Sequence, residues 1–307
     1  MGDDTKTEGT GYLSEKRSGL LLLHKVPGTT SFQDLRLIKK RLGHGKVGHA
    51  GTLDKFAEGL LIVACGRYTR LLSLFEALDK TYEARLLFGT ETETLDPEGE
   101  PTRRSDIPTY GEVEGVLPSF MGRIEQLPPR YSAIHVGGKR AYDLARRGED
   151  FQVPSRVVEI KRLEVIRAAL PELDVIIDCS KGTYIRSLAR DIARGCGAAA
   201  HLSKLKRLSI GPFSLDEGVK AEDFDPERHL MSPESFLERL DQVEIMKVQE
   251  EVVPRLRQGR KINATWFLGE PKKNIVALFD QQQNFLALIE RHQDGWVYRM
   301  VIPEAAL

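Results

Sequence analysis

The 307-residue sequence has no apolar run that approaches the roughly 18 residues of a membrane-spanning helix. It has only three cysteines, and no CxxC spacing. Cys65 and Cys179 lie in apolar runs. With Cys196 the cysteines are odd in number, so we expect buried free thiols rather than disulfides or metal ligands. The polar, acidic residues 1–16 lack the character of a secretory signal. We therefore expect a cytoplasmic protein without a membrane anchor or a bound metal.

The sequence also lacks a net charge, because 45 lysines and arginines balance 45 aspartates and glutamates. The charges are nevertheless segregated along the chain. Residues 36–49 hold five basic residues and no acid, and residues 181–207 carry a net charge of +6. Residues 214–245 carry a net charge of −7. This segregation is compatible with a nucleic-acid-binding surface and, equally, with ordinary solvated helix faces.

The composition is that of a folded globular protein, with 41% hydrophobic and 29% charged residues. Residues 1–18 are expected to form a disordered leader. Strand-like and helical runs then follow each other without regular βαβ alternation, which predicts an α+β domain over 19–242 with a mixed, mostly antiparallel sheet. Three short strand-like runs near the end predict a small β-rich C-terminal domain over 243–307.

Local signals predict several elements of the larger domain. A capping box that begins at Ser31 predicts a helix that ends at Gly43. An antiparallel pair of strands is expected within 153–179. The acidic, turn-rich residues 91–100 predict a surface loop, and the acidic residues 221–240 predict a helix.

Residues 48–54, Gly-His-Ala-Gly-Thr-Leu-Asp, place one carboxylate at the end of a glycine-punctuated loop. Gly48 and Gly51 allow backbone angles that other residues resist and let a ligand approach the main chain. Asp54 could there serve as a nucleophile, a general base or an electrostatic stabiliser. The alternative is an ordinary turn or capping aspartate, and the loop alone does not decide between them.

Five separated motifs, in this order and spacing, resemble the TruB-type tRNA pseudouridine synthases over about residues 19–213. They are KVPG at 25–28, GHAGTLD at 48–54, KTY at 80–82, CSKGTYIR at 179–186, and AHL with LKR at 200–207. The chain departs from the family at two positions. Lys55 follows Asp54 where a proline is usual, and Val26 follows Lys25 where a proline is common. Neither position carries the chemistry.

Two further segments are similar to parts of that family. The proline-rich residues 127–133, with GKRAY at 138–142, resemble the insertion that stand-alone members use to grip the T-arm of tRNA, here residues 127–150. Residues 243–307 are similar in outline to an RNA-binding PUA or PUA-like domain. The insertion favours an enzyme that acts on free tRNA as a monomer. A guide-RNA-dependent relative and a non-catalytic RNA-binding protein of the same fold are the alternatives.

The resemblance implies that the uridine at position 55 in the T-loop of tRNA is isomerised to pseudouridine, without a cofactor, a metal or a redox step. A carboxylate must then approach the ribose or the uracil, and the base must leave its stack. The resemblance assigns Asp54 as the nucleophile, Tyr82 as the stacking partner that also helps remove the C5 proton, and Arg186 as the ionic partner of Asp54. It further implies substrate contacts by His49, Tyr184, Leu205 and Lys25. Core packing is the alternative for Tyr82 and Leu205, and a solvated helix face for Arg186.

Overall fold

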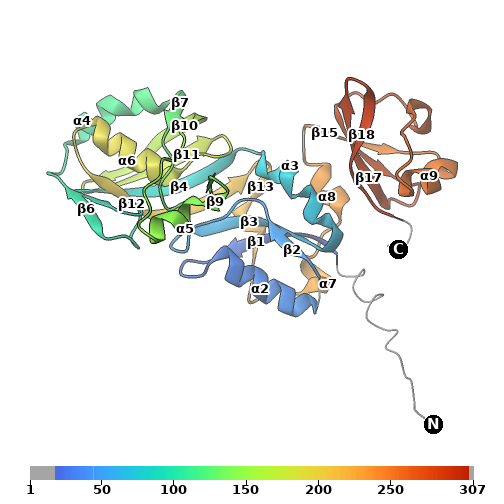
Figure 1. The fold of residues 1–307 in the computed structure, drawn as a ribbon, viewed down its shortest axis with the longest axis horizontal. Coiled ribbons are helices and arrows are strands. Elements are labelled where there is room, and N and C mark those ends of the chain that lie inside the picture. Colours follow the sequence, from blue (N-terminus) through green and yellow to red (C-terminus); the bar gives the residue numbers. More distant parts are fainter. Residues whose placement is uncertain (1–17, 44, 304–307) are drawn as a thin grey trace, which may run out of the picture.

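A computed structural model describes residues 18–43 and 45–303 of the chain (Figure 1). Figure 1 shows a large domain built on one long sheet, and a smaller β domain set beside it. The predicted leader lies outside the described residues, except for Ser18. No helix in the described ranges is both long enough and apolar enough to cross a membrane.

The large sheet has ten strands, eight of them in the order β14-β1-β3-β12-β4-β11-β10-β7, with β13 beside β12 and β2 beside β3. Most neighbouring strands are antiparallel, whereas β1–β14 and β3–β12 are parallel. The predicted α+β class with a mixed, mostly antiparallel sheet is therefore confirmed, and the predicted strand pair is β10–β11. The strands are β1 (Gly19–Lys25), β2 (Val47–His49), β3 (Glu58–Cys65), β4 (Lys80–Phe88), β7 (Gly122–Gln126), β10 (Arg156–Ala169), β11 (Glu172–Cys179), β12 (Ala200–Ile210), β13 (Phe213–Ser214) and β14 (Val219–Lys220).

Two small hairpins and a set of short helices complete the described chain. The hairpins are β5 (Thr90–Thr92) with β6 (Pro101–Arg104), and β8 (His135–Val136) with β9 (Lys139–Arg140). The α-helices are α2 (Ser31–Leu42), α3 (Leu72–Glu76), α4 (Tyr110–Val116), α5 (Ala141–Arg146), α6 (Ile185–Gly195), α7 (Pro226–His229), α8 (Pro233–Leu237) and α9 (Val253–Arg257). The 3-10 helices are η1 (Gly66–Leu71), η2 (Leu117–Phe120), η3 (Leu215–Glu217), η4 (Glu250–Val252) and η5 (Ala264–Trp266).

Around β1 and β3 the sheet is buried on both faces, because most side chains of these two strands are apolar and buried. Successive side chains of a strand point to opposite faces. In β1, Leu21 and Leu23 therefore join one hydrophobic cluster with residues of α2 and α6. Leu20 and Leu22 join a second cluster on the other face, with residues of α3, α8 and the C-terminal domain.

The N-cap of helix α2 lies one residue before the predicted one. Thr30, and not Ser31, closes the capping box: its Oγ1 accepts from the backbone N–H of Gln33 (3.2 Å), and its own N–H donates to Gln33 Oε1 (2.7 Å). Ser31 is buried and turned inward, where its Oγ pairs with the backbone of Leu53 at 3.2 Å. Gly43 ends the helix with φ 79°, as predicted.

The prediction for residues 91–100 is right in part, and the prediction for residues 221–240 is wrong. Residues 93–100 form a turn-rich loop between β5 and β6 with exposed glutamates, but Glu91 and Asp96 are only 6% and 4% exposed, and each pairs with an arginine of α6. Residues 221–240 do not form one helix. Pro226 and Pro233 each stand at the start of a short helix, where proline fits, and they interrupt any longer one.

The C-terminal domain has the predicted β-rich character, in a four-stranded sheet of order β15-β16-β17-β18. Its strands are β15 (Val243–Lys247), β16 (Ile275–Phe279), β17 (Phe285–His292) and β18 (Gly295–Val301). The domain is not separate in its packing. Phe279 and Leu288 belong to the same cluster as Phe75 and Phe213 of the large domain, and as Phe236 of α8, whose ring packs against those of Phe75 and Phe213. The RNA-binding role predicted for it stays a prediction.

We expect Phe236→Ala to lower the free energy of unfolding by about 3–5 kcal/mol, because a fully buried aromatic ring leaves a cavity when it is removed. The ring centroid of Phe236 lies 4.9 Å from that of Phe213 and 5.8 Å from that of Phe75. Urea denaturation measures the change. Phe32→Ala is the matched control, since Phe32 is 68% exposed and its loss should cost within about 0.5 kcal/mol. Equal effects of the two substitutions would contradict a core shared between the domains.

Candidate active site

The loop that carries Asp54 connects β2 to β3 and is fixed to its surroundings at several points. The N–H of Ala50 donates to the carbonyl of Ile62 (2.9 Å), and Gly51 has the left-handed φ of 90° that the turn requires. Leu53, next to Asp54, pairs with Ser31 at the start of α2. The loop therefore holds its carboxylate against two neighbouring elements.

Lys25 is a buried cation that stabilises this loop by donating hydrogen bonds to its backbone. Its side chain has 0% exposure, and its Nζ donates to the carbonyls of Val26 (3.1 Å), Lys55 (3.3 Å) and Ala57 (2.5 Å). Burial lowers the pKa of Lys25 to about 8. That Lys25 contacts substrate stays an untested prediction, and its placement favours support of the backbone around Asp54.

Arg207 supports the same loop from β12, a role that the sequence analysis did not assign. Its side chain is 2% exposed, with Nε donating to the carbonyl of Leu60 (2.7 Å) and Nη2 to that of Gly51 (3.0 Å). Gly59, with φ 127°, lies so close that a Cβ there would come within 2.4 Å of the Arg207 backbone. The signal available in the sequence is that Arg207 lies in a strand of alternating apolar and polar residues. Its neighbour β3 is apolar and has Gly59 near its start.

Arg186, in the first turn of α6, meets Asp54 as predicted. Its Nε lies 2.8 Å from Asp54 Oδ2, and its Nη2 donates to Oδ1 at 3.1 Å. The Nε–H bond is not aligned on Oδ2, so the pair combines one hydrogen bond with a close ionic contact. Arg186 is only 5% exposed, which excludes the alternative of a solvated helix face.

A second carboxylate, Asp96, lies on the other side of Arg186 and was missed by the sequence analysis. Asp96 Oδ2 is 3.3 Å from Arg186 Nη1, and that Nη1 also donates to the carbonyl of Thr94 (2.7 Å). Asp96 is held in turn by the hydroxyl of Thr94 (2.5 Å) and the N–H of Glu98 (3.0 Å). Arg186 is thus fixed between two aspartates.

The electrostatic surroundings of Asp54 act in opposite directions. Burial of the carboxyl raises its pKa above the ordinary value, and the charges of Asp96 and Glu98 add to that rise. Arg186 is the main group that opposes it. Because 35% of the Asp54 side chain remains exposed, the carboxylate is tied on one side and open on the other. Such a carboxylate can attack a bound ligand.

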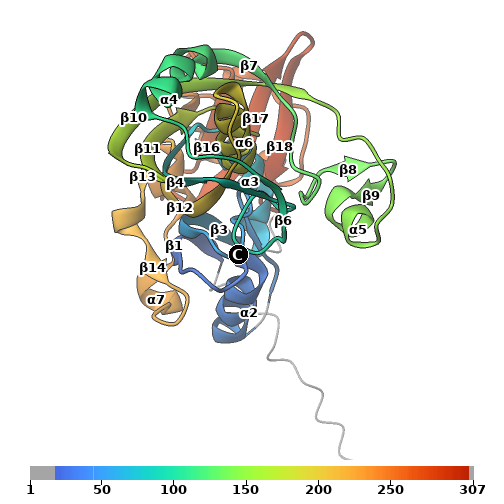
Figure 2. The same cartoon turned by 90° about the vertical axis from the view of Figure 1, so that its left-hand side faces the viewer.

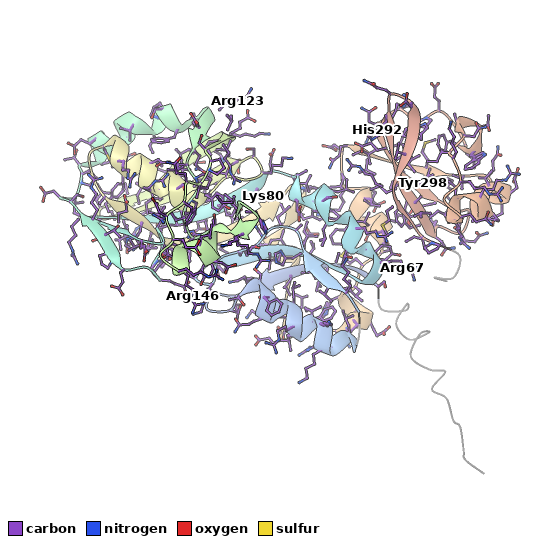
Figure 3. The ribbon with its side chains drawn as sticks, viewed as in Figure 1. Arg67, Lys80, Arg123, Arg146, His292 and Tyr298 are labelled. Carbon is purple, nitrogen blue, oxygen red and sulfur yellow. The ribbon has the colours of Figure 1, made fainter. Side chains whose placement is uncertain are left out.

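Tyr82 lies on β4, the strand whose Lys80 is labelled in Figure 3. It lies opposite Arg207 of β12 and Ile177 of β11 in the sheet. The ring is 8% exposed, and burial raises the pKa of the phenol, so it is neutral. Packing and a ligand contact are both open to a side chain in this position.

The other residues predicted to bind substrate lie on β2, immediately before α6 and on β12. His49, on β2, is half-buried, and burial lowers its pKa to about 4, so the ring is neutral. Tyr184 precedes α6, its backbone paired with the side chain of Gln126 and its ring 5.2 Å from the Arg156 guanidinium carbon. Leu205 is 8% exposed and shares a cluster with Tyr82. That they contact substrate stays a prediction.

The segment over 127–150 projects from the body as β8, β9 and α5 (Figure 2). Its base is attached to α6: the carbonyl of Leu127 accepts from Ser187 Oγ (2.9 Å) and Arg190 Nη2 (2.9 Å). The carbonyl of Tyr131 accepts from Arg186 Nη2 (3.0 Å). The segment therefore shares its anchor with Asp54. In the described part of the chain, no group of three or more His, Cys, Asp or Glu side chains is arranged to hold a metal ion.

Comparisons with known proteins agree with this arrangement. The profile described as "TruB family pseudouridylate synthase (N terminal domain)" matches residues 39–185. The chain is 43% identical over 222 residues to tRNA pseudouridine synthase B of Borreliella burgdorferi (strain ZS7), covering 71% of this chain and 78% of that protein. It is 39% identical over 257 residues to tRNA pseudouridine synthase B of Caulobacter vibrioides, covering 80% and 81%. The archaeal box H/ACA sRNP Nop10-Cbf5 complex has a chain of similar fold, with TM-score 0.69, 20% identity and coverage of 98% and 91%.

We expect Lys25→Met to lower the free energy of unfolding by about 1–3 kcal/mol, because buried carbonyls around the Asp54 loop lose their donor. Urea denaturation measures the loss. Lys55→Met is the matched control in the same loop, since Lys55 is 54% exposed and makes only an exposed ion pair with Glu98 (3.4 Å). Its loss should cost about 1 kcal/mol at most. A Lys25→Met protein as stable as the Lys55→Met protein would show that the ammonium does not support the loop.

Proposed function

This chain belongs to the TruB family of pseudouridylate synthases and is an isomerase that acts on tRNA, and we propose that Asp54 is its nucleophile. The proposed substrate is the uridine at position 55 in the T-loop, presented as a flipped-out base. The observation that carries the proposal is the Asp54 carboxylate, fixed by the buried Arg186 and still 35% exposed.

The reaction is an isomerisation, so its atoms balance without a co-reactant. The N-glycosidic bond breaks, the uracil turns, its C5 joins the ribose C1′, the C5 proton leaves, and N1, released from the ribose, takes up a proton. Asp54 attacks C1′ or the uracil ring and is released when the new bond forms. Tyr82 offers its ring to the flipped base, which replaces a stacking partner lost from the RNA. As a neutral phenol, it also assists removal of the C5 proton by hydrogen bonding.

The remaining contacts position the RNA. His49, Tyr184 and Leu205 form the wall against which the opened T-loop packs. Lys25 supports the protein loop that carries Asp54. The insertion over 127–150 grips the T-arm with the exposed basic residues Lys139, Arg140, Arg146 and Arg147. Residues 243–307 bind RNA as a PUA-like domain. We propose that the protein acts on free tRNA as a cytoplasmic monomer.

The decisive experiment incubates the purified protein with unmodified tRNA and no other RNA or protein, and then maps pseudouridine along the product. Modification confined to the T-loop uridine supports the proposal. Modification that appears only when a guide RNA is added would identify a guide-dependent enzyme. Tight binding without modification would identify a non-catalytic RNA-binding protein. Modification at another uridine would overturn the assigned substrate position.

Asp54→Asn should abolish turnover while tRNA affinity stays within a few-fold of the parent, because contacts to the phosphate backbone lie elsewhere. The measurements are a single-turnover assay at saturating enzyme and a binding titration. Asp178→Asn is the matched control, since Asp178 lies on β11 and pairs with Arg162 at the surface. Multiple turnover by a clean preparation of Asp54→Asn would refute the assigned nucleophile.

Arg186→Met should slow the single-turnover rate by about 100-fold or more, as losing a few kcal/mol of orientation and charge stabilisation would do. Arg186→Lys should keep a small residual rate, because an ammonium gives charge without the planar fork. Since Arg186 opposes the rise in the Asp54 pKa, its removal raises that pKa further. The acid limb of the rate against pH should therefore move to higher pH in Arg186→Met.

Arg194→Met, on the same helix, is the control for this pair. Arg194 is half exposed and pairs with Glu91 (2.7 Å) instead of Asp54. Its variant should keep the parent's rate and pH profile. A normal rate in Arg186→Met, or a slowed rate with an unmoved acid limb, would show that Arg186 does not tune the carboxylate.

A further inference from the structure

One side of α2 is an exposed basic surface that the proposed mechanism does not use. Phe32, Gln33, Arg36, Leu37 and Lys40 are spaced so that they fall on one side of the helix. Phe32 keeps 68% of its surface exposed, although it is a large aromatic residue. Beside it, the side chains of Gln33, Arg36 and Lys40 are exposed and that of Leu37 is half-buried. These five residues are called the α2 face below.

The cations of the α2 face are unpaired. The side chains of Arg36 and Lys40 form no hydrogen bond or ion pair with any described residue. Arg41, just beyond them, differs: its guanidinium donates to the carbonyls of Glu222 and Phe224 and joins α2 to the segment before α7. Figure 1 shows α2 at the lower edge of the large domain, with α7 beside its end. The α2 face therefore presents free positive charge to solvent.

The composition of the α2 face suits RNA. Single exposed aromatics are common on protein surfaces and by themselves indicate nothing. An exposed ring beside unpaired cations is different, because unpaired bases stack on aromatic rings while lysine and arginine contact the phosphates. A protein partner is less well matched, since Leu37 is half-buried and Phe32 is the one large apolar side chain that the face exposes.

The position of the α2 face connects it to the catalytic loop. Ser31, at the start of α2, pairs with Leu53, and the N–H of Gly28 donates to the carbonyl of Lys55 at 2.9 Å. Phe32 therefore comes directly after Ser31, and Ser31 contacts Leu53, the residue before Asp54. Lys40 lies eight residues further along, or about 12 Å at 1.5 Å per residue. An RNA whose uridine reaches Asp54 has its neighbouring nucleotides within this distance.

We propose that the α2 face is a second RNA-binding surface for the substrate tRNA, separate from the residues around Asp54 and from the insertion over 127–150. Phe32 stacks on an unpaired base, and Arg36 and Lys40 contact phosphates on either side of it. This inference rests on the proposed function, because it takes a tRNA bound at Asp54 as the occupant. It adds a surface that determines affinity and leaves the chemical step unchanged.

The test measures tRNA affinity at several salt concentrations for the full-length protein and its variants. Phe32→Leu should weaken binding about fivefold or more, the lower end of the effect of one stacked base, and Phe32→Tyr should not. The double variant Arg36→Gln with Lys40→Gln should reduce the slope of log affinity against log salt by about 1.4–1.8, at 0.7–0.9 per phosphate contact. Arg228→Gln, on α7 and 82% exposed, is the control and should change neither quantity.

A single-turnover assay at saturating enzyme separates failure of the inference from failure of the proposed function. If the parent modifies no uridine, the proposed function is wrong. If the parent is active but the α2 variants bind tRNA with its affinity and salt slope, the inference is overturned and the face is free for another partner. Loss of affinity with an unchanged saturating rate supports the inference. Loss on an isolated T-arm hairpin then places the contact in that arm, and loss only on full tRNA places it beyond.

Discussion

The buried guanidinium of Arg186 is the constraint on which the catalytic site depends. It lies between the carboxylates of Asp54 and Asp96 and donates to the carbonyls of Thr94 and Tyr131. A buried cation is tolerated only when its charge and its donors are satisfied, and removing one partner of such a pair typically costs several kcal/mol. The catalytic loop, the segment after β5, the insertion and α6 must therefore all meet around this one side chain. The position of Asp54 is a consequence of that meeting.

The same arrangement explains how one carboxylate can be both fixed and reactive. Asp96 shares the positive charge of Arg186, so Asp54 does not receive all of its compensation. Burial raises the pKa of Asp54 while Arg186 opposes the rise, and the exposed third of the side chain is left for a ligand. Lys25 and Arg207 donate to backbone carbonyls of the loop and its flanks, so they position the aspartate without forming an ion pair with it in the described part of the chain.

Sequence motifs were sufficient to predict the contact between Asp54 and Arg186, and the order of the strand-like and helical runs was sufficient to predict the α+β class. Asp96 was missed, because residues 91–100 have the composition of a solvated loop, and Asp96 and Glu91 pair with arginines of α6 that lie 90 or more residues away in the sequence. The error over 221–240 was avoidable, since Pro226 and Pro233 were visible in the sequence. The role of Lys25 was not visible, because no local pattern shows which carbonyls converge on an ammonium.

Strand β3 connects the site to the C-terminal domain. Leu61 and Val63 of β3 belong to the cluster on the face of Tyr82, whereas Leu60 and Ile62 belong to the cluster shared with the C-terminal domain. Tyr68 of η1, which follows β3 directly, has its ring centroid 6.2 Å from that of Phe285 in β17. The strand that closes the Asp54 loop is therefore packed on its far face by residues beyond Val243. The C-terminal domain therefore contributes to the core that packs the strand after the Asp54 loop.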